Sequence, residues 1–237
     1  MDYENHNGVM RSGKIALYNM DCMELLRQTP DKYYSLCVVD PPYGVDINMN
    51  LGRKKDAAKP KRERKTWDSG IPDPAYFLEL ARVSVHQIIW GGNYFPLQPR
   101  GGWVYWDKDI AEGVSFGDGE LAYATCETVV RRVRIQWSGF LGADGQRIHP
   151  TQKPVKLYEW LLTNYAKPGQ RILDTHLGSG SSAIAAHNLG FDFVGTELDA
   201  DYYAAACKRF EAHKAQASLF QPIDYAQIAR EVQESLL

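Results

Sequence analysis

The chain has 237 residues, 44% hydrophobic and 24% charged, which is typical of a folded globular protein. Its formal net charge of −2 excludes a uniformly basic nucleic-acid binder, and no apolar run approaches the ~18 residues of a membrane span. The four cysteines form no C-x-x-C pair and the first residues do not resemble a signal peptide, so we expect a cytoplasmic protein without a metal site or membrane contact.

Strand and helix patterns then follow in chain order. Strands are predicted at 14–18, 34–40, 86–92, 101–108, 120–126, 128–137, 171–175 and 191–197. Helices are predicted at about 23–26, 73–84, 154–166, 181–190 and 199–215. Strands and helices alternate through the last third, which favours a doubly wound, mostly parallel α/β sheet. Residues 120–126 and 128–137 are interpreted as a hairpin.

Two segments interrupt this alternation. We expect one domain over residues 1–237, with irregular insertions at about 45–70 and 126–150. Within the first insertion, residues 53–65 hold eight basic and two acidic side chains. Such a run is usually a solvated loop, but it is also suited to contacting phosphates.

A glycine-rich turn, "DTHLGSGSS" at 174–182, follows a predicted strand and opens a predicted helix. Glu197 ends the next strand, at about the distance where an acid binds ribose hydroxyls in nucleoside-binding folds. The glycine spacing is not G-x-G-x-x-G, so a dinucleotide is not the first choice. The alternative is a turn that needs glycine only for close packing.

A second motif, "DPPY" at 40–43, follows the apolar strand "LCVV". Ligands of open α/β sheets bind outside the carboxyl ends of the strands. Pro41 and Pro42 stiffen the exit from the strand, so the Asp40 carboxylate and the Pro41 carbonyl can accept both N–H groups of an amine. Tyr43 is suited to stacking on a base flipped out of a duplex. The alternative is a simple turn after the strand.

These motifs resemble those of the amino-methyltransferases of DNA, which use S-adenosylmethionine to methylate N6 of adenine or N4 of cytosine. The resemblance rests on "DPPY", "DTHLGSG" (174–180) and "HPTQKP" (149–154) and runs from about Lys14 to Phe210. Because the catalytic motif precedes the glycine turn, the order is similar to that of the permuted β group. The resemblance implies the Rossmann-like fold of class I methyltransferases, with S-adenosylmethionine as cofactor.

The resemblance also implies site residues. It places catalysis at Asp40, Pro41, Pro42 and Tyr43. It places cofactor binding at Asp21, Cys22, His149, Thr151, Lys153, Asp174, Thr175, His176, Leu177, Gly178, Ser179, Gly180, Ser182 and Glu197. Asp21 would approach the adenine end of the cofactor, although local sequence alone favours a helix N-cap there. His149, Thr151 and Lys153 would line the amino-acid end.

His176 departs from the family pattern, which usually has Asp-Pro-Phe before the glycines. We interpret its imidazole as a replacement for the aromatic cofactor contact, with a general base as the alternative.

DNA contacts are expected from two groups of basic residues. They are Arg53, Lys54, Lys55, Lys61, Arg62 and Arg64 in the first insertion, and Arg131, Arg132, Arg134 and Arg147 in the second, where the resemblance implies a small target-recognition region.

The main hypothesis is a site-specific DNA adenine-N6 methyltransferase acting on double-stranded DNA, because the resemblance associates Asp in "DPPY" with adenine. Cytosine-N4 or RNA-base methylation is an alternative, as is a non-catalytic DNA-binding protein of the same fold. The resemblance leaves room for a homodimer and for a cognate restriction enzyme, and the sequence decides neither.

Overall fold

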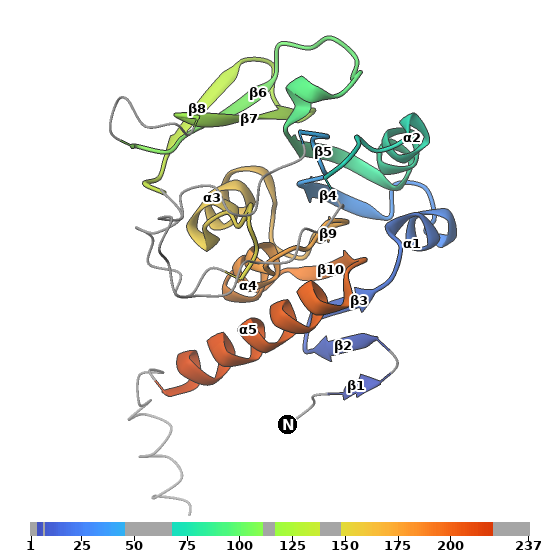
Figure 1. The fold of residues 1–237 in the computed structure, drawn as a ribbon, viewed down its shortest axis with the longest axis vertical. Coiled ribbons are helices and arrows are strands. Elements are labelled where there is room, and N and C mark those ends of the chain that lie inside the picture. The colour runs from blue at the N-terminus through green and yellow to red at the C-terminus, as the bar shows by residue number, and fades with distance from the viewer. Residues whose placement is uncertain (1–3, 7, 46–67, 111–116, 138–147, 220–237) are drawn as a thin grey trace, which may run out of the picture.

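A ten-stranded β-sheet forms the centre of the computed structural model, which describes residues 4–6, 8–45, 68–110, 117–137 and 148–219 (Figure 1). In spatial order its strands are β1 (Glu4–His6), β2 (Val9–Ser12), β3 (Ile15–Asn19), β10 (Asp192–Glu197), β9 (Arg171–Asp174), β4 (Tyr34–Val39), β5 (Ser84–Trp90), β7 (Gly119–Ala124), β6 (Trp103–Asp107) and β8 (Val130–Arg134). The central strands β3, β10, β9, β4 and β5 run parallel. The predicted α/β sheet is therefore confirmed.

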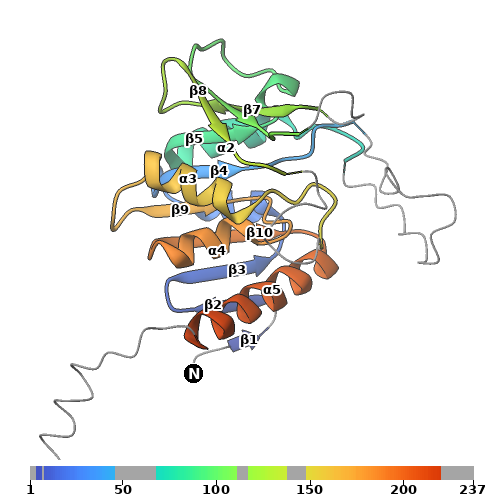
Figure 2. The ribbon, with the colours of Figure 1, turned by 90° about the vertical axis from the view of Figure 1, so that its left-hand side faces the viewer.

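Helices cover both faces of this sheet (Figure 2). One face carries α1 (Cys22–Gln28) and α2 (Pro74–Val83), and the other carries α3 (Val155–Tyr165), α4 (Ser181–Asn188) and α5 (Ala200–Leu219). A short 3₁₀ helix, η1 (Gly92–Tyr94), follows β5. Strand β4 serves both cores, because its side chains alternate between the two faces. Its fully apolar run therefore reflects burial on both sides.

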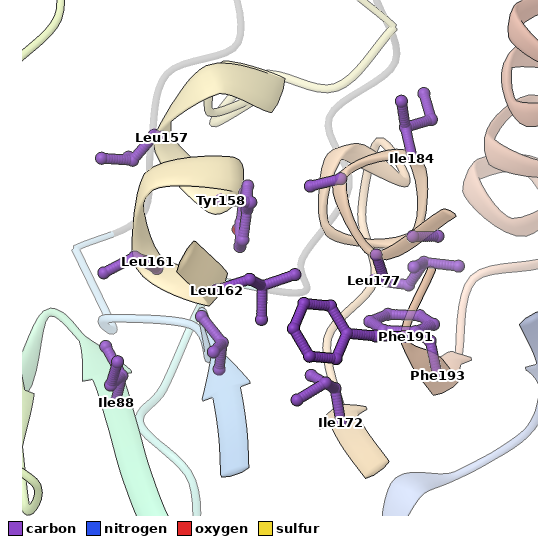
Figure 3. Close-up of a cluster of buried hydrophobic side chains, with 14 of the residues drawn as sticks. Ile88, Leu157, Tyr158, Leu161, Leu162, Ile172, Leu177, Ile184, Phe191 and Phe193 are labelled. Atoms are coloured by element: carbon purple, nitrogen blue, oxygen red, sulfur yellow. The ribbon is translucent and has the colours of Figure 1, made fainter. Parts of the chain in front are cut away.

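The larger core lies under α3 and α4 (Figure 3). Leu161 and Leu162 of α3 pack there with Ile172 of β9 and Phe193 of β10. Each of these side chains is at most 2% exposed, and full burial of one such side chain contributes roughly 1.5–3 kcal/mol. This packing fixes α3 and the glycine-rich turn on the same side of the sheet.

Side-chain N-caps begin two of the helices, α1 and α2. The Asp21 carboxylate accepts a hydrogen bond of 2.8 Å from the backbone N–H of Met23, so the predicted N-cap is confirmed. Asp73 caps α2 in the same way, and Pro74 occupies its first turn. None of the described helices has the length and apolar character needed to cross a membrane.

The predicted hairpin of 120–126 with 128–137 is wrong. Strand β6 lies between β7 and β8, pairing antiparallel with β7 and parallel with β8. The link from β7 to β8 crosses the start of β6, where a side chain on Gly102 would lie 2.0 Å from the carbonyl oxygen of Glu127. Because Gly102 has no Cβ, the segment that links β7 to β8 can pass directly against the start of β6.

The expectation of an irregular insertion over 126–150 needs correction too. Residues 130–134 extend the main sheet as β8, because Val133 is buried in the larger core. Most of the insertion predicted at 45–70 lies outside the described residues, as do Arg53, Lys54, Lys55, Lys61, Arg62, Arg64 and Arg147.

Candidate active site

The carboxyl ends of the parallel strands converge on one cavity of about 680 Å³. The chain leaves β9 and β4 toward opposite sides of the sheet, which creates the crevice where ligands of such sheets bind. Of the predicted site residues, the cavity is lined by Asp21, Cys22, Asp40, Pro42, His149, Thr151, Lys153, Thr175, His176, Leu177, Gly178, Ser179 and Glu197. The structure therefore brings three separate sequence motifs to one place.

The Asp40 carboxylate is held at the end of β4 by two hydrogen-bond donors. Its Oδ1 accepts a bond of 2.6 Å from the Tyr43 hydroxyl, and its Oδ2 lies 2.6 Å from the Lys153 ammonium. A carboxylate has about four lone-pair positions, so two are left for a ligand in the cavity. The side chain is 13% exposed. Asp40 is thus an oriented acceptor that still has capacity.

The rest of the "DPPY" segment is fixed by its neighbours. The Asp68 carboxylate accepts bonds from the backbone N–H groups of Tyr43 (2.9 Å) and Gly44 (3.0 Å). A Cβ on Gly91 would lie 2.2 Å from the Tyr43 ring, so only glycine allows this approach. The Tyr43 ring stacks on Tyr94 at 5.0 Å with an interplanar angle of 11°.

This arrangement bears on the predicted role of Tyr43. One ring face is already covered by Tyr94, and Tyr43 is not among the residues lining the cavity. Base stacking by Tyr43 therefore stays a prediction, while its hydroxyl clearly orients Asp40. Tyr94 is 48% exposed and forms the outer ring of the stack.

Lys153 lines the cavity and belongs to the Asp40 cluster. Its ammonium bonds to Asp40, to Glu120 at 3.1 Å and to the Tyr43 hydroxyl at 3.2 Å. Its place at the amino-acid end of a cofactor stays a prediction. The Lys153 side chain is only 2% exposed. A cation so deeply buried needs such partners, since desolvation would otherwise drive off its proton.

Glu120 completes this cluster from the other side. It lies near the start of β7, which runs antiparallel to β5. The start of β7 therefore lies at the edge of the sheet where the parallel strands end. Its Oε1 lies 2.8 Å from the Lys108 ammonium. Burial would raise the pKa of Glu120, but Lys153 and Lys108 lower it to about 2. Glu120 is therefore ionised at neutral pH.

The glycine-rich turn is built around a buried acid, Asp174. Its Oδ2 accepts a 2.6 Å bond from the Ser182 hydroxyl and its Oδ1 accepts one of 3.0 Å from the His176 backbone N–H. Burial raises the pKa of Asp174 to about 7, although the two hydrogen bonds act in the opposite direction and lower it. Asp174 and Ser182 do not line the cavity. They support the turn from behind.

Left-handed backbone conformations shape the same turn. Gly178 and Gly180 have φ values of +52° and +75°, which glycine adopts without strain. The Arg209 guanidinium donates to the Ser179 carbonyl and the Ser181 hydroxyl, both at 2.9 Å, and so ties α5 to the turn. Gly180 lies at the N-cap of α4 and does not line the cavity.

Glu197 ends β10 with its carboxylate at the cavity wall. Its Oε2 accepts from the backbone N–H of Gly178 and its Oε1 from that of Asp199, both at 2.9 Å. Burial is the main cause that raises the pKa of this carboxyl. Leu198 beside it is 73% exposed and offers an apolar surface to the cavity. A carboxylate next to an exposed apolar side chain suits a sugar joined to a base.

The "HPTQKP" segment adds polar groups beside the glycine-rich turn, since a Cβ on Gly178 would lie 3.6 Å from the His149 ring. His149 packs edge-on against Tyr202 at 4.4 Å, and its Nδ1 lies 3.0 Å from the Thr151 hydroxyl. Gln152 was not predicted as a site residue, yet it lines the cavity. Its Nε2 is buried without an acceptor among the described residues. This N–H is therefore available to an acceptor in the cavity.

His176 points its ring toward α2. Its Nδ1 lies 2.9 Å from the Thr175 hydroxyl and 3.5 Å from that of Tyr76. Burial lowers the pKa of His176 to about 4, so the imidazole is neutral at physiological pH. Burial likewise raises the pKa of the nearby Cys22 thiol to about 12. Neither residue carries a charge in the cavity.

The predicted DNA-binding arginines of β8 lie in ion pairs on the sheet edge. Arg131 pairs with Glu127 at 3.1 Å and Arg134 with Asp107 at 2.9 Å, while both side chains stay more than half exposed. Arg132 is also exposed. Since β8 runs parallel to β6, Arg134 lies toward the same edge as the cavity. DNA contact by these residues stays a prediction.

Sequence reasoning missed Lys108, Glu120 and Gln152. Lys108 ends the predicted strand 101–108 and Glu120 begins the predicted strand 120–126, but only strand direction brings them to the site. No group of three or more His, Cys, Asp and Glu side chains among the described residues is arranged to hold a metal ion.

A family model described as DNA methylase, of the N6/N4 class, matches residues 54–208. Type II methyltransferase M2.DpnII of Streptococcus pneumoniae is 27% identical over 147 residues, which are 62% of this chain and 50% of that protein. Putative methylase YubD of Escherichia coli (strain K12) is 38% identical over 68 residues, or 29% of this chain and 30% of that protein. The chain thus spans half or less of the length of these curated relatives.

Two solved structures share the fold. The PvuII DNA methyltransferase (cytosine-N4-specific) gives a TM-score of 0.55 at 18% identity, covering 83% of this chain and 86% of that one. The M1.HpyAVI–SAM complex gives 0.54 at 18% identity, covering 82% and 99%. These matches place the sheet among class I methyltransferase folds. Since the family model spans more than half of its residues, the chain belongs to the N6/N4 DNA methylase family.

Proposed function

We propose that the chain transfers a methyl group from S-adenosylmethionine to the exocyclic amine of a DNA base, with N6 of adenine as the expected target. One observation carries the proposal. The Asp40 carboxylate, oriented but not saturated, opens into the same cavity as the glycine-rich turn and Glu197. Amine acceptor and nucleoside-binding features therefore share one space.

The cavity fits the proposed cofactor. Its volume of about 680 Å³ lies within the range of small-molecule sites, roughly 300–1,000 Å³. Both Glu197 and Leu198 line the cavity, and we expect Glu197 to accept from ribose hydroxyls and Leu198 to contact the base. The unsatisfied Nε2 of Gln152 is suited to the cofactor's carboxylate. S-adenosylmethionine bound there supplies an electrophilic methyl group, which the amine takes while the electrons of the broken S–C bond stay on sulfur.

Asp40 supplies the chemistry that an aromatic amine needs. The lone pair of such an amine is delocalised into the ring, so the nitrogen is a poor nucleophile. A hydrogen bond to the Asp40 carboxylate orients the amine and favours the positive charge that develops on nitrogen. Bound to the amine in this way, Asp40 would also take the proton released from nitrogen. Burial raises the pKa of this carboxyl, which makes it a better acceptor.

The choice of base is the finer part of the proposal. Adenine is favoured because "DPPY" carries Asp at its first position, and this association comes from the family. Cytosine N4 presents a similar amine and is the alternative. The proposed substrate is duplex DNA, and the proposed compartment is the cytoplasm. A second copy of the chain, in a homodimer, and a cognate restriction enzyme are the further partners that the family allows.

The test is a product analysis. The protein is incubated with duplex DNA and S-adenosylmethionine carrying a labelled methyl group, and the DNA is digested to nucleosides for mass spectrometry. Labelled N6-methyladenine is expected. N4-methylcytosine would correct the base but keep the reaction. Cofactor binding without transfer to DNA or RNA would instead favour a non-catalytic protein.

A further inference from the structure

Glu120 contacts no group that the proposed reaction uses directly, yet it shares a buried cation with Asp40. We propose that Glu120 is a positioning residue. It shares the Lys153 ammonium with Asp40, so this cation does not fully neutralise Asp40, and the Asp40 carboxylate keeps a net negative charge toward the amine. This inference rests on the proposed function and adds a role that the motifs alone do not assign.

The hydrogen-bond geometry is the first support. The Lys153 ammonium has three N–H donors and three acceptors, namely Asp40 Oδ2 at 2.6 Å, Glu120 Oε2 at 3.1 Å and the Tyr43 hydroxyl at 3.2 Å. The Tyr43 hydroxyl gives its own proton to Asp40 at 2.6 Å. Lys153 is therefore saturated, while Asp40 keeps lone pairs for a ligand.

The charge balance is the second support. Asp40, Glu120 and Lys153 together carry one net negative charge, and the amine opposite becomes positive as it is methylated. Lys108 balances Glu120 from the outer side, 2.8 Å from its Oε1. Tyr43, Tyr158 and Asp174 are the other titratable groups that interact with the carboxylates. With Lys108 included the four groups sum to zero, but Lys108 does not line the cavity whereas Asp40 does, so the charge facing the amine is that of Asp40, which favours the methylated amine.

The two carboxylates are also unequal in acidity. Burial raises the pKa of Asp40 and the charge of Glu120 adds to that rise, although Lys153 opposes both. Glu120 faces two lysines and stays ionised. In a pair of carboxyl groups whose pKa values differ, the group with the higher pKa commonly takes the proton and the other stays charged. Here Asp40 takes the proton and Glu120 holds the lysine.

Loss of the Glu120 charge would leave Lys153 to Asp40 alone. Asp40 would then form an ordinary ion pair, its pKa would fall, and it would become a weaker proton acceptor. The rate of methyl transfer declines at low pH when Asp40 is protonated, so the midpoint of that decline reports this pKa. It should move to lower pH in Glu120→Gln.

The experiment measures single-turnover methyl transfer to duplex DNA across pH, with cofactor binding measured by calorimetry. For Glu120→Gln we expect a midpoint lower by about one pH unit and a plateau rate lower by about tenfold. Cofactor affinity should stay within about twofold, since that wall of the cavity is unchanged. Glu120→Asp retains the charge and should keep the wild-type midpoint.

Two further variants sharpen the result. Glu127→Gln removes a paired glutamate from the turn after β7, where it contacts Arg131 and Tyr165, and should behave as wild type. Lys108→Met removes the outer cation and should move the midpoint to higher pH, the opposite direction. This variant also tests the inference if Glu120→Gln does not fold.

An unmoved midpoint in Glu120→Gln, or a rate loss equal at every pH, would overturn the positioning role while wild-type activity upholds the proposed function. A midpoint unmoved in Lys108→Met would count against it in the same way. A wild-type protein that transfers no methyl group would refute the proposed function itself.

Discussion

Asp174 makes the stability of this protein depend on pH in a predictable direction. The carboxyl is 1% exposed, and burial raises its pKa from 3.8 to about 7. An unfolded chain releases this proton near pH 4, whereas the native state keeps it until about pH 7. Because the native state binds more protons in this window, the stability of the wild-type protein falls as pH rises through it.

Asp174→Asn removes this dependence while preserving the hydrogen bonds. The amide oxygen can accept from the His176 backbone N–H, and the amide nitrogen can donate to the Ser182 hydroxyl. The pKa difference of about three pH units corresponds to ~4 kcal/mol as an upper limit, because one unit equals about 1.36 kcal/mol. The free energy of unfolding of the variant should therefore increase relative to that of wild type as pH rises.

The assay is urea unfolding followed by circular dichroism at several pH values from about 4 to about 8. The difference in free energy of unfolding between variant and wild type should grow by up to ~4 kcal/mol across this range and then level off above pH 7. A difference that is the same at every pH would refute the reasoning. The difference should be smallest at the lowest pH, where the carboxyl is protonated in the native state and still partly protonated in the unfolded chain.

Three other variants test separate parts of the site. Gly91→Ala places a methyl group against the Tyr43 ring, so the methyl-transfer rate should fall at least tenfold while cofactor affinity stays unchanged. A variant with the wild-type rate would contradict the proposed packing. Gln152→Ala removes the unsatisfied donor and should weaken cofactor binding about 10- to 100-fold in calorimetry, as expected for a hydrogen bond to a charged group, and unchanged affinity would refute that contact. Neutralising the basic side chains of 53–65 should weaken DNA binding and flatten its dependence on salt, and an unchanged salt slope would exclude phosphate contact there.

Much of the site follows from local sequence, because the acids at 40 and 197 and the glycines at 178 and 180 directly end or follow predicted strands. Parallel strands end at one edge of a sheet, so the α/β pattern predicts that such residues share that edge. They meet here because β4, β9 and β10 are neighbours, which the pattern alone does not give. The confirmed N-cap at Asp21 is equally local.

Glu120 and Lys108 could not be found in this way. Glu120 begins its strand and reaches the site only because β7 runs antiparallel to β5. Periodicity does not record strand direction, and for the same reason it could not show that β6 separates β7 from β8. Lys153 belongs to a recognised motif, but the burial that assigns it to Asp40 arises from tertiary packing.

The central claim is that Asp40 acts on an amine beside bound S-adenosylmethionine, and Asp40→Ala tests it most directly. Methyl transfer to duplex DNA and cofactor affinity are measured on the same preparations of variant and wild type. Transfer should fall by about 10²–10⁴-fold, the contribution typical of a positioned acid–base group, while cofactor affinity stays within a few-fold. A variant that still methylates DNA at a rate near that of wild type would contradict the account.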